Sequence, residues 1–308
     1  MTTHRDVALM KASEYTGREG VIGVAITGSV ARDWLWAGSD VDLYVVREGE
    51  TGFEDGVCEG IYWEVDLKPS SYLDVDLSDR RWTEPLPLFE GEETIVESLW
   101  GCEIVYDPQG KLEKVRAAID KCMGDPAWLN RRAANYVQYG LGCVDALRFA
   151  EPLTAIVGAR CVATDYGVTA FWMKRGGLLT SVSRIPEMLP AGSAIHALYR
   201  DIFSLNGEAE ARQILDSIGL LRPTIQLEIQ RDIELEMLPL LGHGVYDGLV
   251  RYLRQGVPSW FSPEDAKPVL GLEPDLGAQA ARVLDQTREL LTAVAFLDFD
   301  AGEFKPFT

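Results

Sequence analysis

Hydrophobic and polar positions in the first hundred residues follow short helical and strand-like patterns. Residues 4–16 have helical periodicity, and the apolar, β-branched segment at residues 21–27 predicts a buried strand. Two further strands are predicted at residues 41–46 and 61–67, with the segment GETGFEDG between them as a turn. A short helix at ETIVESLW and a strand at EIVYD follow, and the turn DPQG ends this part. The pattern therefore predicts a small mixed α/β domain.

From Lys111 onward nearly every segment has the three- and four-residue spacing of amphipathic helices. Within residues 127–150 one apolar or small face is formed by Ala133, Tyr136, Val137, Gly140, Leu141, Val144 and Leu147. Similar patterns lie at residues 155–175, 208–219, 224–241 and 279–297. We therefore expect an α+β protein with a mixed-sheet domain at residues 1–108 and an all-helical domain at residues 109–308. The length of 308 residues is compatible with two domains.

The charge balance bears on the choice of partner. The chain has 48 acidic and 29 basic residues, which gives a formal net charge of −19. Such a chain repels a phosphate backbone unless its basic residues are segregated, and the sequence contains no Lys/Arg run. A nucleic-acid partner is therefore unexpected, whereas an acidic cleft would attract a cationic small molecule. The same charge is also explained by solubility alone.

Cysteine and histidine usage disfavours several kinds of site. The five cysteines are widely spaced without a C-x-x-C pair, and the three histidines do not form an H-E-x-x-H motif. P-loop, G-x-G-x-x-G and G-x-S-x-G signatures are also missing. The N-terminus has no signal-like apolar segment, and no apolar run approaches the roughly 18 residues of a membrane span. We therefore expect a cytoplasmic protein that is not embedded in a membrane.

Candidate chemistry lies in the segment GSVARDWLWAGSDVDLYVV. Gly28 and Ser29 follow the first predicted strand, and Asp40 and Asp42 stand at the head of the second. An Asp-x-Asp pair alone is weak, because the chain also has Asp74/Asp76 and Asp298/Asp300. Neither of those pairs follows a Gly-Ser turn. The setting between two strands therefore distinguishes the first pair.

These residue types suit phosphate chemistry that depends on metal ions. Because strand side chains alternate between faces, Asp40 and Asp42 point the same way and can hold divalent cations. Asp66 lies on the next predicted strand and is expected to reach the same ions. Three carboxylates and two Mg²⁺ ions would activate a hydroxyl and neutralise a triphosphate. Gly28 permits close backbone approach, and Ser29 can bind a phosphate.

A hydrophobic strand, Gly-Ser, ten intervening residues, Asp-x-Asp and a later carboxylate together resemble the polymerase β-like nucleotidyltransferase superfamily. The later VYDPQGKLEKV resembles the end of the catalytic core in the antibiotic-modifying branch. The helical remainder is similar in layout to the C-terminal domain of aminoglycoside nucleotidyltransferases. The resemblance implies a small mixed-sheet nucleotidyltransferase core followed by a helical acceptor-binding domain. The motif covers residues 20–68, about a sixth of the chain.

Site roles follow from the resemblance for this sequence. It implies Gly28 and Ser29 as phosphate-binding residues, Asp40 and Asp42 as metal ligands, and Asp66 as third ligand or general base. Glu64 stays open as an alternative to Asp66, since it lies two residues earlier on the same strand face and the register decides between them. Arg32 and Lys68 are secondary candidates for binding the triphosphate, because a cation there would offset the charge on the leaving pyrophosphate. A role as ordinary surface basic residues explains them equally well.

The implied activity is transfer of a nucleoside monophosphate, AMP from ATP, to a hydroxyl of a small molecule such as an aminoglycoside-like antibiotic. Two alternatives remain open: adenylylation of a protein or RNA, as in antitoxins, and a non-catalytic nucleotide-binding protein. Acidic and aromatic residues of the helical half are of the right types to hold a cationic sugar, although core packing is the simpler explanation of the aromatic ones. These residues are Asp145, Glu151, Asp165, Tyr136, Tyr139, Tyr166 and Trp172.

Overall fold

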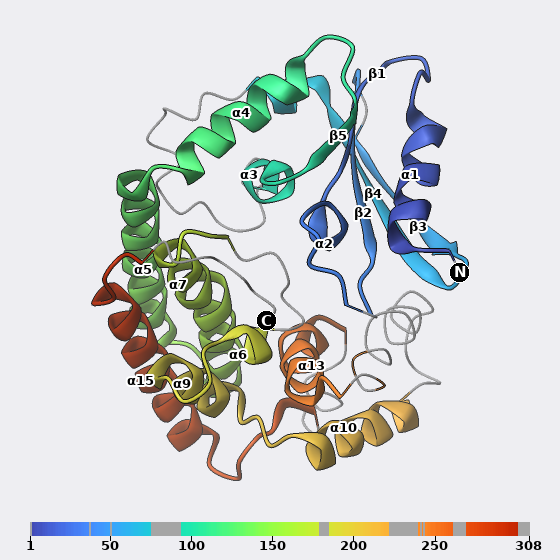
Figure 1. Ribbon diagram of the computed structural model, residues 1–308. Coiled ribbons are helices and arrows are strands. Elements are labelled where there is room, and N and C mark those ends of the chain that lie inside the picture. The colour runs from blue at the N-terminus through green and yellow to red at the C-terminus, as the bar shows by residue number, and fades with distance from the viewer. Residues whose placement is uncertain are drawn as a thin grey trace. The chain divides into compact units, whose positions relative to one another are not determined.

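The chain forms two compact units in a computed structural model (Figure 1). The structure describes residues 2–36, 38–49, 51–74, 94–178, 185–221, 240, 242, 244–260 and 269–300. The first unit comprises Met1–Leu129, Gly176–Ser181 and Glu303–Thr308, and the second comprises Asn130–Arg175 and Val182–Gly302. The fold class is α+β, as the sequence predicts: a mixed sheet in the first unit and helices in the second.

The first unit is built on a five-stranded sheet with the order β3-β4-β2-β1-β5. Its strands are β1 (Val21–Ile26), β2 (Val41–Arg47), β3 (Gly52–Cys58), β4 (Ile61–Pro69) and β5 (Glu103–Tyr106). The pair β2 and β4 is parallel, and the other neighbouring pairs are antiparallel. Because β2 and β4 run in the same direction, side chains near their N-terminal ends lie close together at the same end of the sheet.

Helix α1 (His4–Tyr15) covers one face of this sheet (Figure 1). Its buried residues pack on apolar side chains that alternate along the three central strands. The sheet residues of this core include Val24, Ile26, Val41, Leu43, Val45, Val65 and Leu67. The intervening side chains of β2 and β4 therefore point to the opposite face, and these include Asp42, Glu64 and Asp66.

Strand β3 corrects one expectation, since the segment GETGFEDG is predicted as a turn but supplies most of this strand. β3 lies at the edge of the sheet, and Phe53 and Val57 are 59% and 51% exposed. A strand without a buried apolar face has no alternation of apolar and polar residues to identify it. A Glu59-Gly60 turn then joins β3 to β4, and both turn residues have positive φ.

Helix α4 (Lys111–Met123) belongs to the sheet-containing unit. The boundary expected at residue 108 precedes this helix, whereas the contacts divide the chain after Leu129. Gly23 explains the association, because a Cβ added there would lie 2.3 Å from Leu112 Cδ1. The missing side chain on β1 lets Leu112 pack directly on the strand. Helices α2 (Gly28–Ala31) and α3 (Thr94–Leu99) also belong to this unit.

The second unit consists of helices in its described residues, and most of them follow the predicted periodicity. Its elements are most of α5 (Pro126–Leu147), then α6 (Pro152–Val162), the π-helical η3 (Ala163–Val168), α7 (Thr169–Lys174), α8 (Ile185–Met188), α9 (Ala194–Phe203), α10 (Glu208–Leu221), α13 (Tyr246–Trp260) and α15 (Leu276–Ala295). Helix α15 packs on α6, α9 and η3. The helix predicted at residues 224–241 lies almost entirely outside the described residues.

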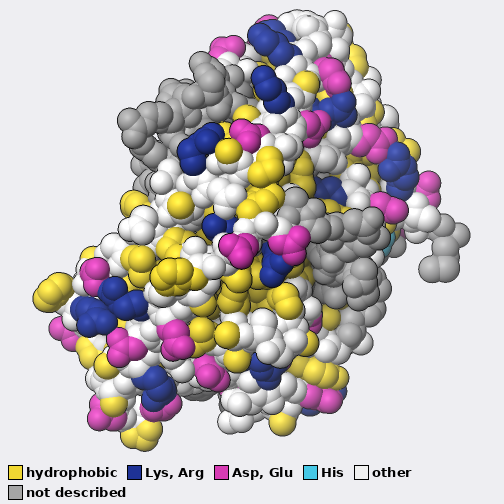
Figure 2. All heavy atoms as spheres, turned by 60° about the vertical axis from the view of Figure 1, so that its left-hand side comes forward, with side chains coloured by type: hydrophobic (Ala, Val, Ile, Leu, Met, Phe, Trp, Pro, Cys, Tyr) yellow, Lys and Arg dark blue, Asp and Glu magenta, His cyan; other side chains and the backbone are white. Residues whose placement is uncertain are grey.

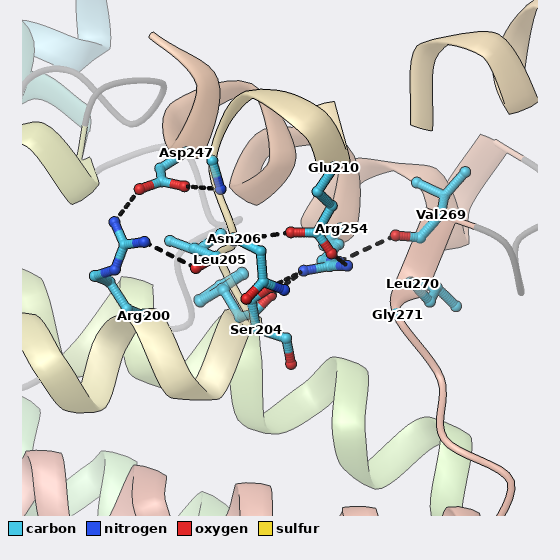
Figure 3. A network of polar contacts seen from close by, with 12 residues as sticks. Arg200, Ser204, Leu205, Asn206, Glu210, Asp247, Arg254, Val269, Leu270 and Gly271 are labelled. Carbon is cyan, nitrogen blue, oxygen red and sulfur yellow. Dashed lines mark hydrogen bonds and ion pairs between the residues drawn. The ribbon is translucent and has the colours of Figure 1, made fainter. Parts of the chain in front are cut away.

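Buried arginines tie several helices of this unit together, and Figure 3 shows the contacts of one of them, Arg254. Arg254 of α13 donates to the carbonyl oxygens of Phe203, Ser204 and Val269, and its guanidinium lies 2.5 Å from Glu210. Arg160 of α6 donates to the carbonyl oxygens of Ile202 and Leu270, at 3.1 and 2.7 Å. Carbonyl groups at the end of α9 are left without helical partners, so these side chains satisfy them.

Several surface arginines of the second unit are paired with acids. Arg148 bonds Asp285 at 2.9 Å, and Arg175 bonds Asp300 at 2.8 Å. On the face drawn in Figure 2, basic and acidic side chains are interspersed among the described residues. Among the described helices, none is long and apolar enough to cross a membrane.

Candidate active site

Gly28 and Asp42 form the closest packed part of the site. Strand β1 is buried along its whole length and ends next to Thr27, whose amide donates to the carbonyl oxygen of Asp42 at 2.9 Å. Gly28 follows with φ +63°, and a Cβ added there would lie 1.7 Å from Asp42 Oδ2. Glycine is therefore required twice, once for the left-handed backbone and once for the space that the carboxylate occupies.

Three carboxylates meet beside this glycine. Asp40, Asp42 and Glu64 each present an oxygen within 4.8 Å of the others, and they are a group of acids, among the described residues, that could hold a metal ion. The parallel register pairs Asp42 of β2 with Glu64 of β4. Ser39 holds the backbone that leads into Asp40. Its hydroxyl accepts from the Trp36 amide at 3.1 Å, and its carbonyl oxygen lies 2.8 Å from His4 Nε2.

Burial and mutual repulsion make it unfavourable for all three acids to be ionised without a cation. Burial first, then the neighbouring Asp40 and Glu64 carboxylates, raise the pKa of Asp42 well above its usual value, while Arg32 acts in the other direction. Burial also raises the pKa of Asp40, against the influence of His4. Carboxylates that are half-buried and close together, as these three are, gain from a bound divalent cation, which removes their mutual repulsion. The donor set of three carboxylates therefore fits such an ion.

Ser29 adds a polar group with free hydrogen-bonding capacity. Its Oγ is buried and has no hydrogen-bond partner among the described residues. A buried hydroxyl without a partner is costly in a folded protein and is frequently explained by a ligand. Because Ser29 directly follows Gly28, this hydroxyl belongs to the same turn as the carboxylate contact and is compatible with phosphate binding.

Asp66 does not join the three carboxylates. The register pairs it with Tyr44, two positions beyond the pair Asp42 and Glu64, which corresponds to about 6–7 Å along the strand. Its carboxylate lies 2.9 Å from Lys68 Nζ, and Lys68 also lies over the ring of Tyr72. The geometry places Glu64, and not Asp66, beside Asp40 and Asp42, while the identity of the third ligand stays a prediction.

Arg32 has partners other than a phosphate. Its Nε donates to the Trp100 carbonyl oxygen at 2.9 Å, and its Nη1 donates to the Gly28 carbonyl oxygen at 3.1 Å. The guanidinium also lies near the rings of Trp34 and Trp100, with its carbon 5.7 and 5.4 Å from their centroids. These contacts join α2 to the turn after α3, so the arginine holds the Gly-Ser turn in place beside Asp42.

The other acidic pairs are separate from this group. Asp74 is exposed after a short 3-10 helix (Ser70–Leu73), and Asp76 lies outside the described residues. Asp300 pairs with Arg175, and Asp298 is exposed. Sequence reasoning missed His4, which lowers the pKa of Asp40 from 36 positions earlier in the chain. No local pattern identifies that contact, because it depends on how α1 packs.

The aromatic residues considered for acceptor binding are mostly packed inside the second unit. Tyr136, Tyr166 and Trp172 are buried. Tyr139 is 41% exposed and lies against Tyr166 in a tilted arrangement, with ring centroids 5.1 Å apart. Among the acids, Asp145 bonds Arg288, Glu151 precedes α6 and is exposed, and Asp165 is partly buried in the π-helical turn. Their part in acceptor binding stays a prediction.

Comparisons with known proteins add little to this geometry. The sequence matches no protein-family model and no protein in a comparison with curated sequences. A structural comparison finds similarity to a nucleotidyltransferase-like protein from Exiguobacterium sibiricum, with 11% identity and a TM-score of 0.28. The match covers 94% of this chain and 75% of the other. At that score the similarity supports no conclusion about function.

Proposed function

We propose that the protein is a metal-dependent nucleotidyltransferase that transfers a nucleoside monophosphate, AMP from ATP, to a hydroxyl of a small molecule. The observation that carries the proposal is the meeting of Asp40, Asp42 and Glu64 within 4.8 Å of one another, beside Gly28 and Ser29. Paired strands, half-buried acids and a glycine turn occur together here, and each has a use in handling a triphosphate. Glu64 takes the place that the sequence assigned first to Asp66.

The residues have distinct roles in this reaction. Asp40, Asp42 and Glu64 would hold Mg²⁺, which neutralises phosphate charge and lowers the pKa of the acceptor hydroxyl when it is bound. Ser29 Oγ donates to a phosphate oxygen. The acceptor oxygen forms a bond to the α-phosphorus as the bond to pyrophosphate breaks, and Glu64 takes the hydroxyl proton. Arg32 holds the Gly28 carbonyl and offsets the negative charge of Asp42.

A cationic acceptor suits the acidity of the chain. The net charge of −19 and the three carboxylates favour an amine-bearing molecule over an anionic one. An aminoglycoside-like antibiotic has both the amines and the hydroxyl groups that this proposal needs. A panel of aminoglycosides, lincosamides and neutral polyols, tested with each nucleoside triphosphate and Mg²⁺, would identify the acceptor by pyrophosphate release.

Matched substitutions on β4 test the assignment of the third carboxylate. Glu64→Gln removes a charge from the carboxylate group, whereas Asp66→Asn removes one from the ion pair with Lys68. We expect Glu64→Gln to lower kcat by about 10²–10⁴-fold, the usual contribution of a proton-transfer group, and Asp66→Asn to have a much smaller effect. The opposite ranking would return the role to Asp66. Absence of pyrophosphate release with every acceptor and triphosphate would refute the transferase.

A further inference from the structure

A second acid lies beside Glu64 on the side away from Asp42. The antiparallel register of β3 and β4 pairs Asp55 with Glu64, just as the parallel register pairs Glu64 with Asp42. Directly paired residues on neighbouring strands share a face of the sheet. Asp42, Glu64 and Asp55 therefore form one row across β2, β4 and β3. Like charges that face each other across strands are destabilising, so the pair Glu64 and Asp55 needs a compensating group.

Tyr62 supplies that group. It precedes Glu64 by two residues on β4, hence on the same face, and its hydroxyl donates to Asp55 Oδ2 at 2.9 Å. The antiparallel pairing of Asp55 with Glu64 places this hydroxyl next to position 64. A phenol is protonated near neutral pH, so it has a proton to donate. One neutral phenol thus binds the acid that faces Glu64 across the strands.

The donor count of a phenol determines what this contact can do. A tyrosine hydroxyl has one proton to donate, and the Asp55 carboxylate accepts it. Glu64 then keeps its lone pairs for a cation on its other side, where Asp40 and Asp42 lie. Asp55, held by the phenol, presents a negative charge to the side of Glu64 away from Asp42, which disfavours that side for the Glu64 carboxylate. Groups that contact a metal ligand in this way commonly set its orientation and affinity.

We propose that Tyr62, anchored by Asp55, is a positioning residue that directs the Glu64 carboxylate toward Asp40 and Asp42. The inference rests on the proposed function only in assigning these three carboxylates to a divalent cation. It goes beyond that function because neither Tyr62 nor Asp55 belongs to the carboxylate group itself. No transferred atom touches either residue in this scheme, so their effect is exerted through Glu64 alone.

Cation affinity measured without nucleotide tests the proposal directly. The full-length protein is titrated with Mn²⁺, and the free ion is counted by its electron paramagnetic resonance signal. We expect Tyr62→Phe to weaken binding by roughly tenfold or more, the usual effect of removing a group that orients a metal ligand. The control is Tyr106→Phe on β5, at the opposite edge of the sheet, which should bind as the wild type does. Unchanged affinity in Tyr62→Phe overturns the proposal.

Asp55→Ala provides a second variant, which removes the acceptor of the phenol and leaves Tyr62 in place. If Asp55 acts through the phenol, this change weakens Mn²⁺ binding, and the double variant is no worse than the weaker single variant. If the losses of Mn²⁺ affinity in the two single variants multiply in the double variant, Tyr62 and Asp55 act independently. That result would overturn the proposal that Asp55 anchors Tyr62. Glu64→Gln belongs in the same titration. If it leaves affinity unchanged, the metal assignment of the proposed function fails, whereas a weakened Glu64→Gln beside an unchanged Tyr62→Phe overturns only the positioning role.

Discussion

Replacing Gly28 by alanine tests whether the position of Asp42 is essential. The new Cβ would lie 1.7 Å from Asp42 Oδ2 and 2.8 Å from its Cγ. Ordinary contact distances between heavy atoms are about 3.5 Å or more, so the carboxylate oxygen must retreat by roughly 1.8 Å. The left-handed backbone, with φ +63°, adds about 1–2 kcal/mol of strain for any residue with a Cβ.

Gly49→Ala separates these two effects. Gly49 also has a left-handed backbone, with φ +67°, but a Cβ there meets nothing within 4 Å. In urea denaturation the backbone strain should cost both variants about 1–2 kcal/mol of unfolding free energy, and Gly28→Ala should lose more because its Cβ also overpacks against Asp42. Only Gly28→Ala displaces the carboxylate, and a shift of about 1 Å at a reacting group can cost on the order of 10²-fold in rate. The reasoning is refuted if Gly28→Ala releases pyrophosphate as fast as Gly49→Ala does.

Two further predictions concern stability. The folded pKa of Asp42 lies above the ordinary value of 3.8, so its ionisation opposes folding, and stability falls as pH rises from about 3.8 through the folded pKa. Asp42→Asn should therefore raise the Tm of the metal-free protein near neutral pH, and this gain should shrink toward pH 4. The same variant should abolish turnover. A lower Tm than the wild type, measured in EDTA, would contradict the prediction. Gly23→Ala places a Cβ 2.3 Å from Leu112 Cδ1 and should cost about 1–3 kcal/mol through overpacking. Urea denaturation checks it, with Gly52→Ala, whose nearest contact is 3.3 Å, as the milder comparison.

The buried strands could be predicted from sequence because their apolar residues are contiguous. β1 is buried at every position, and β2 has apolar residues on one face and a mixture on the other. The prediction failed at β3, where the exposed edge position leaves Phe53 and Val57 in solvent. Periodicity reports burial and not hydrogen bonding, so an edge strand with two exposed faces resembles a turn.

The first two carboxylates could also be predicted, whereas the third could not. Asp40 and Asp42 are neighbours in sequence and follow a Gly-Ser turn, so local reasoning reaches them. The choice between Glu64 and Asp66 depends on the register of β2 against β4, which no local pattern encodes. Both acids stand on the same face, so alternation cannot separate them either. Contacts such as that of Arg32 with Trp100, 68 positions away, are equally non-local.

Register and the glycine turn together explain why one acid of β4 is selected. The Thr27 amide bonds the Asp42 carbonyl, which ties the end of β1 to the start of β2, and Gly28 then leaves room for the Asp42 side chain. With Asp42 fixed, the parallel pairing leaves a single β4 position directly beside it, and Glu64 occupies that position. A shift of two residues would bring Asp66 there but would also remove Tyr62 and Asp55 from the acid beside Asp42. The arrangement therefore depends on the three strands as a unit, and a change in the β3-β4 pairing should affect cation binding even where Asp40 and Asp42 are intact.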